Sequence, residues 1–233
     1  MPTRVFFALV TTTIIAATAI GMADDLSSLI DRDFIDGGVF ADLEGKDAVI
    51  ANKELYRCTF RGGTFERARF ERIVFEACVF EDCDLTRISL AHSSMRGARF
   101  VRCKLLGVHF ATLGDHPELA FESCDLRYAV FDGLSLRTTR FIDCGLQETG
   151  FNDADLIDTD FSGSEMSGAI IARSDLAGAD FSRAEGVFID PAKNRAKDVM
   201  VSPEAAVQLA RSLGMRVDGY DEPRAAPKKK TRR

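Results

Sequence analysis

The chain has 233 residues, of which 46% are hydrophobic and 28% charged, and its formal net charge is −6. An acidic chain is a poor direct binder of nucleic acid, because phosphates need basic side chains, and the short basic C-terminal segment alone is a weak, nonspecific signal. The sequence contains no phosphate-binding loop, nucleophile elbow or metal-ligand motif. We therefore expect neither catalysis nor a metal, a cofactor or a small-molecule substrate.

Residues 1–23 resemble a secretory signal peptide. Arg4 precedes a largely apolar run, residues 5–20, and residues 21–23 provide Gly and Ala for a cleavage site. The run is too short and too weakly flanked to be a membrane span. We expect export to the periplasm if this segment directs secretion, and a cytoplasmic protein if translation starts at Met22.

Residues 24–39 are predicted to cap the N-terminal end of a repetitive region, residues 40–186. This region contains a ladder of phenylalanines, each twenty residues from the last except for one step of twenty-one. The members are Phe40, Phe60, Phe80, Phe100, Phe121, Phe141, Phe161 and Phe181. A fixed period of this length indicates a stack of structural repeats.

A period of five residues lies within the period of twenty. Every fifth residue from Ile50 to Phe110, and again from Phe121 to Phe181, is apolar, and the residue two positions earlier is usually small. This period fits neither a helix nor a free strand, but it fits a chain that turns a corner every five residues. Four sides make a square coil, and about seven coils paired as parallel strands would form a rod on the order of 35 Å long.

The repeat resembles that of the pentapeptide-repeat family, whose unit is a small residue, Asp or Asn, Leu or Phe, and two variable residues. The segments that match this unit directly are Cys124-Asp125-Leu126, Ala154-Asp155-Leu156, Ser174-Asp175-Leu176 and Ala179-Asp180-Phe181. The resemblance covers about residues 35–186 and implies a right-handed quadrilateral parallel β-helix, an all-β solenoid. It does not by itself name a function, because one fold serves many.

All six cysteines occupy the small inward position, where a thiol acts as a compact apolar group. They are Cys58, Cys78, Cys83, Cys103, Cys124 and Cys144. The last four should stack in one column at a spacing within disulfide range, although burial and parallel side-chain vectors would resist bonding. The short spacing that metal ligation needs is absent, so we expect a packing role.

Residues 111–120 carry one residue too many, which accounts for the step of twenty-one. Gly114 and Pro117 in this stretch predict a bulge that swings outward. His92 and His109 are expected to point to solvent, and His116 lies in the bulge. None of these histidines has a partner at a fixed short spacing, so none is a candidate base.

Residues 187–217 are predicted to cap the C-terminal end of the rod. Ser202 as N-cap, Pro203 at the first helical position and Gly214 after the end predict a helix over about 203–213. Its apolar stripe, the candidate dimer interface, consists of Ala206, Leu209, Ala210 and Leu213. Residues 218–233 are rich in Pro, Ala, Lys and Arg and are predicted to form a disordered basic tail.

Charge is uneven along the predicted rod. Residues 53–110 have a net charge of +4, from eleven basic and seven acidic side chains, whereas residues 141–182 have a net charge of −8, from one basic and nine acidic side chains. These nine are the candidate partner-binding residues: Asp143, Glu148, Asp153, Asp155, Asp158, Asp160, Glu165, Asp175 and Asp180. Asp155 should stack on Asp175 and Asp160 on Asp180, with about 0.9 kcal/mol of repulsion per pair in water.

The C-terminal module is similar to that of the gyrase-protecting, quinolone-resistance type within the family. The similarity rests on Ile189-Asp190-Pro191-Ala192-Lys193-Asn194 followed by Ser202-Pro203-Glu204-Ala205-Ala206. It implies a homodimer joined through the C-terminal helix. The acidic rods of the two protomers would imitate duplex DNA and bind DNA gyrase. The chain lacks the long projecting loops of some members of this type.

Other interpretations stay open. Asp before the central residue belongs to the repeat unit, so these carboxylates can serve corner hydrogen bonds rather than a partner. An exported chain would not meet cytoplasmic gyrase and would be an interaction or scaffold module of the cell envelope, while a third alternative is another cytoplasmic protein partner. Salt-sensitive competition with DNA for a partner would favour the DNA-mimic function, and cleavage after Ala23 would favour the cell-envelope function.

Overall fold

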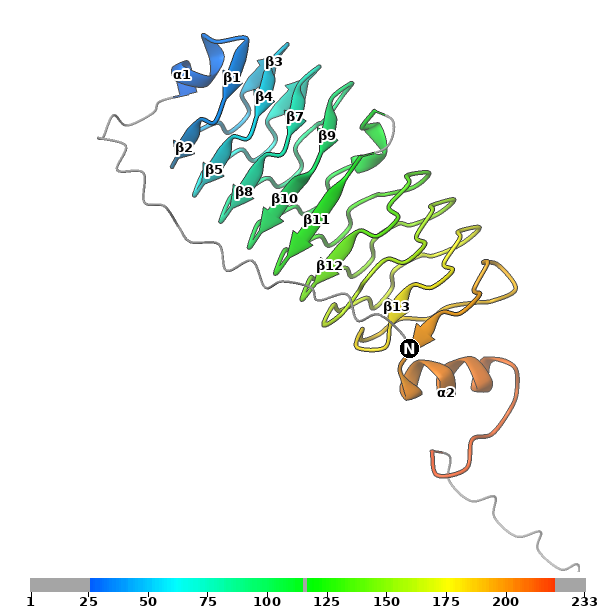
Figure 1. Cartoon of the computed structure of the whole chain (residues 1–233). Coiled ribbons are helices and arrows are strands. Elements are labelled where there is room, and N and C mark those ends of the chain that lie inside the picture. The colour runs from blue at the N-terminus through cyan, green and yellow to red at the C-terminus, as the bar shows by residue number, and fades with distance from the viewer. Residues whose placement is uncertain (1–25, 115–116, 221–233) are drawn as a thin grey trace, which may run out of the picture.

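The computed structural model describes residues 26–114 and 117–220, and over this range the chain winds into a rod of about eight stacked coils (Figure 1). The right-handed quadrilateral parallel β-helix expected from the sequence is confirmed. The expected signal peptide, the basic tail beyond Tyr220 and His116 lie outside the described residues. No helix within the described ranges is long and apolar enough to cross a membrane.

The longest column of strands forms one side of the rod, which we call the long face (Figure 1). Its strands are β2 (Val39–Ala41), β5 (Thr59–Arg61), β8 (Val79–Glu81), β10 (Ala98–Val101), β11 (Leu119–Glu122) and β12 (Arg140–Ile142). Bridges from Arg140 to Asp160 and from Asp160 to Asp180 continue the column to β13 (Asp180–Phe181), which pairs with β14 (Met200–Val201).

The side that precedes the long face along the chain contains β1 (Phe34–Asp36), β4 (Glu54–Tyr56), β7 (Val74–Glu76) and β9 (Ser94–Arg96). A further side contains β3 (Val49–Ala51) and β6 (Arg69–Glu71). Every strand pair is parallel. β1 and β2 already pair with β4 and β5, so residues 34–36 and 39, which were assigned to the N-terminal cap, lie in the first coil.

The phenylalanine ladder lies on the inner side of the long face. Phe40 faces Phe60 in the strand register, and the same alignment repeats through to Phe141. Successive rings stack with centroids 4.5 to 5.1 Å apart. Rings from the opposite side of the coil, such as Phe131 and Phe151, meet the ladder edge-on. Large side chains therefore fill the axis of the rod, and this packing supplies most of its apolar burial.

The chain turns each corner through a residue in the left-handed region two positions after a central residue. Asp153 (φ 55°) and Arg173 (φ 58°) illustrate this on one corner, and Gly133 (φ 74°) occupies the same corner. The left-handed conformation is unfavourable for residues other than glycine. It persists here because most corner amides bond to a carbonyl of the next coil, as Asp153 does to Ala172 (2.9 Å).

The two ends of the rod are covered differently. At the N-terminal end α1 (Leu26–Ile30) buries Leu29 completely, and the buried Lys53 donates to Asp33 (2.9 Å). At the C-terminal end α2 (Pro203–Ser212) begins where expected, with the Ser202 hydroxyl accepting from the Ala205 amide (3.2 Å).

The extra residue of the bulge is absorbed after η1 (Phe110–Thr112). The Gly114 amide bonds to the Ser93 carbonyl (2.9 Å), and β11 then returns to the regular register beside β10. Leu113 and Leu119 are buried on either side of the irregular stretch. The insertion therefore leaves the apolar axis continuous.

Candidate functional site

The nine acidic candidates occupy two kinds of position in the coil. Those at corners have a positive φ and extend into solvent: Asp143, Glu148, Asp153 and Asp158. Those directly before a central residue are partly buried: Asp155, Asp160, Glu165, Asp175 and Asp180. The expected stacking of Asp155 on Asp175 and of Asp160 on Asp180 is present as backbone bridges.

The five partly buried carboxylates all accept a hydrogen bond from the backbone two residues later. Glu165 accepts from the Ser167 amide at 2.8 Å, and Asp180 accepts from the Ser182 amide at 2.8 Å. The same bond joins Asp155 to Ile157, Asp160 to Ser162, and Asp175 to Ala177. The bonds to Ser167 lower the pKa of Glu165 below its usual value. These side chains therefore stabilise the corners. This agrees with the interpretation in which Asp before the central residue serves corner hydrogen bonds.

Three of the nine carboxylates also form ion pairs. Arg173 contacts Asp153 through two nitrogens, at 2.7 and 2.6 Å, and this hydrogen bonding lowers the pKa of Asp153. Arg137 contacts Asp155 at 3.2 Å, and Arg195 contacts Asp175 at 3.0 Å. The charges of these three are largely compensated, which weakens them as determinants of a negative surface.

Six carboxylates of the set have no ion pair within the described residues: Asp143, Glu148, Asp158, Asp160, Glu165 and Asp180. Four of the six belong to the long face. Asp160 and Asp180 lie in its outer row, Asp158 lies at the corner that enters it, and Asp143 lies at the corner that leaves it. The C-terminal half of this face is therefore where uncompensated negative charge collects.

The apolar stripe of α2 is mostly open to solvent. Leu213 is 64% exposed, Leu209 and Ala210 are partly buried, and Ala206 is exposed. Val207, which is not a member of this stripe, is the residue that α2 buries.

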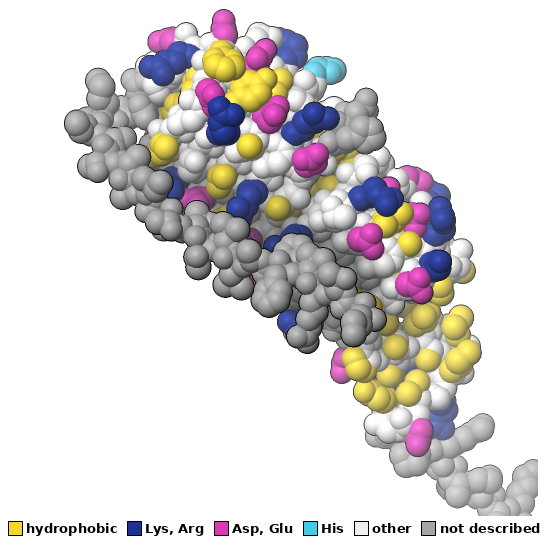
Figure 2. Space-filling model, in the orientation of Figure 1, with side chains coloured by type: hydrophobic (Ala, Val, Ile, Leu, Met, Phe, Trp, Pro, Cys, Tyr) yellow, Lys and Arg dark blue, Asp and Glu magenta, His cyan; other side chains and the backbone are white. Residues whose placement is uncertain are grey.

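Apolar side chains gather at this end of the rod in Figure 2. The stripe borders a groove of about 390 Å³ whose other walls include Ile189, Val201 and Met215. The groove lies between the last coil and α2, so it is an apolar surface of the C-terminal module.

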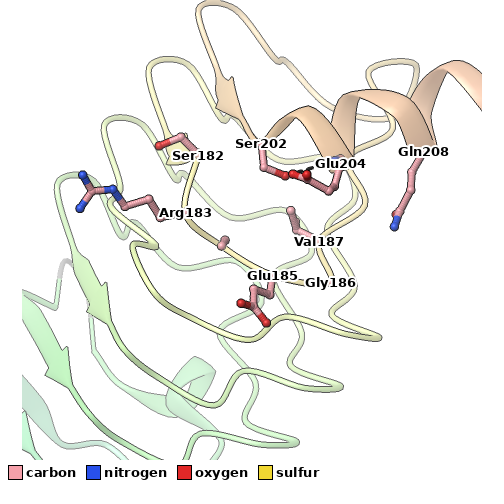
Figure 3. A pocket seen from close by; sticks show the side chains of 10 residues that line it. Ser182, Arg183, Glu185, Gly186, Val187, Ser202, Glu204 and Gln208 are labelled. Atoms are coloured by element: carbon pink, nitrogen blue, oxygen red, sulfur yellow. Dashed lines mark hydrogen bonds between the residues drawn. The ribbon is translucent and has the colours of Figure 1, made fainter. Parts of the chain in front are cut away.

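A second hollow, of about 370 Å³, lies where the last coil meets the start of α2 (Figure 3). Ser202, the N-cap of α2, and Glu204 in its first turn face Gly186 and Val187 across it, whereas Arg183 extends away from the helix. The Ser202 hydroxyl is engaged as the helix cap. No hydrogen bond joins a nucleophile to a base among the described residues that line it, so the geometry gives no reason to assign a reaction here.

The thiols form two buried columns, Cys58 with Cys78 and Cys83 through Cys144, and all six cysteines are free. Contact with the Cys124 and Cys83 thiols, together with burial, raises the pKa of Cys103. Contact with Cys124 and burial likewise raise the pKa of Cys144. Over residues 26–114 and 117–220, no group of three or more His, Cys, Asp and Glu side chains is arranged to hold a metal ion.

One set of contacts was missed at the sequence level. On three corners an arginine lies one coil above an aspartate and contacts both carboxylate oxygens: Arg67 on Asp47, Arg102 on Asp82, and Arg173 on Asp153. The signal was available, because each pair is separated by twenty residues. His92 and His109 are exposed, as expected.

Known proteins were compared with this chain by family model, by sequence and by structure. The model of the family described as pentapeptide repeats matches residues 54–90, 68–105 and 150–185, with eight copies. No curated protein matches the chain in sequence.

Among solved structures, trypsin-treated QnrB1, a plasmid-mediated fluoroquinolone resistance protein, is similar with a TM-score of 0.50 at 22% identity, over 79% of this chain and 89% of that chain. Full-length QnrB1 gives 0.49 at 20% identity, over 78% and 90%. HetL, a pentapeptide repeat protein involved in heterocyst differentiation regulation from the cyanobacterium Nostoc, gives 0.35 at 15% identity, over 75% and 92%. The likeness to trypsin-treated QnrB1, at 22% identity, supports the shared fold alone.

Proposed function

Because this chain is a pentapeptide-repeat protein, we propose that it is a non-enzymatic rod that binds a protein partner through the acidic C-terminal half of its long face. The partner class is a protein that otherwise binds duplex DNA, with DNA gyrase as the first candidate. The chain would then act as a mimic of the negatively charged duplex. The fluoroquinolone resistance named for QnrB1 is the corresponding cellular effect to look for.

One observation carries this proposal. Asp143, Asp158, Asp160 and Asp180 have no ion pair within the described residues, and all four border the same face of the rod. Uncompensated charge on one face produces a directional negative potential, which steers a basic surface toward it. The carboxylates that are paired, such as Asp153, would contribute little to that potential.

We further propose that two copies pair through the C-terminal module. The exposed stripe of Ala206, Leu209, Ala210 and Leu213 borders an apolar groove, and burying it against a second copy would remove this surface from water. Tail-to-tail pairing would set the two acidic halves at the centre of a longer rod.

Pairing can be tested with two matched double variants. Leu209→Asp with Leu213→Asp should convert the assembly to a monomer in light scattering, whereas Gln208→Asp with Ser212→Asp should leave it unchanged. An unchanged mass for the first variant would contradict pairing through α2.

The charge hypothesis can be tested without disturbing the fold. Asparagine is accepted in the left-handed region, so it can replace Asp143 and Asp158, and its side-chain oxygen keeps the corner bond at positions 160 and 180. The fourfold Asp→Asn variant should lose salt-sensitive inhibition of gyrase supercoiling.

The matched control removes four carboxylates from the other half of the rod. Glu44→Gln, Glu54→Gln, Glu76→Gln and Glu118→Gln change exposed side chains that have no ion pair within the described residues. This control should retain inhibition. Equal loss in both variants would show that net charge alone is responsible, and no inhibition by the wild type would reject gyrase as the partner.

A second candidate function is an exported interaction or scaffold module of the cell envelope. It is favoured by the signal-like composition of residues 1–23. Fractionation of expressing cells and the intact mass of the product distinguish the two. Loss of residues 1–23 with recovery outside the cytoplasm would remove gyrase as the natural target, and a cytoplasmic product would remove the envelope function.

A further inference from the structure

The long face also carries a second, oppositely charged surface, midway along the rod. The outer row of this face runs from Arg99 through Ala120 and Arg140 to Asp160, one residue per coil. Arg99 and Arg140 are exposed, and neither forms an ion pair with a described residue. Two strand spacings separate their backbones, about 9.6 Å.

The lack of an ion pair at Arg99 follows from its neighbours in the row. Arg140 has Ala120 on one side and Asp160 on the other, and the Asp160 carboxylate accepts from the Ser162 amide. Elsewhere the coil one period away supplies a carboxylate, as Glu81 does for Arg61 (2.8 Å) and Asp82 does for Arg102 (2.7 Å). Arg99 instead has Val79 on one side and Ala120 on the other. The protein therefore keeps two guanidinium groups on this face without compensating them internally.

Ala120 is the reason that the two arginines enclose a space. Its methyl group is much smaller than its neighbours in the row, and a hollow of about 300 Å³ opens there. Arg99 and Arg140 form the two ends of the hollow, and the next row along it is Val101, Glu122 and Ile142, with the exposed Glu122 between the two apolar side chains. A carboxylate placed above Ala120 would be within reach of both guanidinium groups, which form strong charge-assisted hydrogen bonds with such groups.

We propose that this hollow binds an acidic side chain of an extended segment from a protein partner, with an apolar side chain two residues away, on the same face of that segment, packing on Val101 or Ile142. Glu122 lines the hollow, Asp160 follows Arg140 in the row, and Asp180 follows Asp160. These carboxylates would repel every group of a long run of phosphates, whereas one carboxylate above Ala120 is held by both guanidinium groups. The surface therefore fits an acidic and apolar protein segment rather than a nucleic acid.

The probe for this site is a fluorescein-labelled peptide of repeated Glu-Ser-Val-Ser, which in an extended conformation presents glutamate and valine on one face. It is compared with the same peptide carrying glutamine in place of glutamate. Binding to the full chain is followed by fluorescence anisotropy at ~50 mM salt, where a surface charge pair is only partly screened. The wild type should prefer the glutamate peptide. Asp160→Asn should strengthen its binding, because the change removes a carboxylate beside Arg140.

Three variants locate the binding. Arg99→Gln with Arg140→Gln should weaken binding of the glutamate peptide at least about tenfold, because two charge-assisted contacts are lost. Ala120→Leu should weaken it without changing any charge, because the leucine fills the hollow. Arg87→Gln with Arg96→Gln removes the same charge from exposed sites outside the hollow and should leave binding nearly unchanged.

Several results would overturn the proposal. These are equal binding of the two peptides by the wild type, equal losses in the two double-arginine variants, and tighter, Arg99- and Arg140-dependent binding of a single-stranded oligothymidylate. All the substituted side chains point outward, so circular dichroism should show an intact fold. The peptide assay does not involve gyrase, so its outcome is independent of the function proposed for the acidic end.

Discussion

Truncation of one ring in the middle of the ladder should cost far more than truncation at its end. Phe141 is fully buried, stacks on Phe121 and Phe161 at 5.0 and 5.1 Å, and meets Phe131 and Phe151 edge-on at 5.4 and 5.8 Å. Phe141→Ala removes all four ring contacts and leaves a cavity between coils that cannot collapse without breaking strand pairing. We expect a loss of about 5 kcal/mol in the free energy of unfolding, at the upper end for such a change.

Two other rings serve as references for this prediction. Phe40 stacks only on Phe60 (5.1 Å), so Phe40→Ala should cost about 3 kcal/mol. Phe34 points outward, is 60% exposed and has one tilted contact with Tyr56, so Phe34→Ala should cost no more than about 1 kcal/mol. Urea unfolding followed by circular dichroism measures all three. A Phe141→Ala loss no larger than that of Phe34→Ala would refute the assignment of stability to the stacked axis.

Three further predictions concern charge, thiols and the C-terminal cap. Arginine hydrogen bonds lower the folded-state pKa of Asp47, Asp82 and Asp153, so their stabilisation is present above the unfolded pKa of about 3.9 and is lost as the pH falls through the lower folded values. When the three are replaced by Asn, the urea concentration at the unfolding midpoint should therefore fall less steeply as the pH decreases. An unchanged pH dependence would contradict a stabilising role for these ion pairs. The six buried thiols should react with dithiobis(nitrobenzoate) only as fast as the rod unfolds, and rapid labelling of Cys103 in the native protein would be inconsistent with its burial and raised pKa. Ser202→Ala should cost about 1 kcal/mol by removing the cap on the Ala205 amide, measured by urea unfolding, whereas Ser212→Ala on the exposed last turn should cost less.

The candidate site was only partly accessible to sequence reasoning. The nine carboxylates could be named, and the stacking of Asp160 on Asp180 could be placed, because both follow from the period. Which carboxylates are compensated depends on arginines brought close by the fold. Arg137 contacts Asp155 from eighteen residues away and Arg127 contacts Asp125 from two residues away, so a single period does not identify every partner.

The two ends of the rod show the same limit. Ser202, Pro203 and Gly214 marked α2 to within a residue of its observed end, because capping chemistry is local. That α2 buries Val207 rather than Leu209 or Leu213 depends on how the helix lies against the last coil, which no local pattern records. Lys53, buried beneath Ile30 and Asp33, was not identified for the same reason.

By itself the sequence determined the coil, its register and its axis. An inward position that recurs every five residues must be filled by apolar side chains whatever residues occupy the outer positions. Phe121 and Phe141 occupy such positions, so the sequence period alone identifies them. The tertiary structure alone decided the character of the outer surface. There, the ion pairs of each arginine and the hollow above Ala120 depend on which side chains of adjacent coils come into contact. Asp153 forms an ion pair with Arg173, whereas Arg99 and Arg140 form none with a described residue.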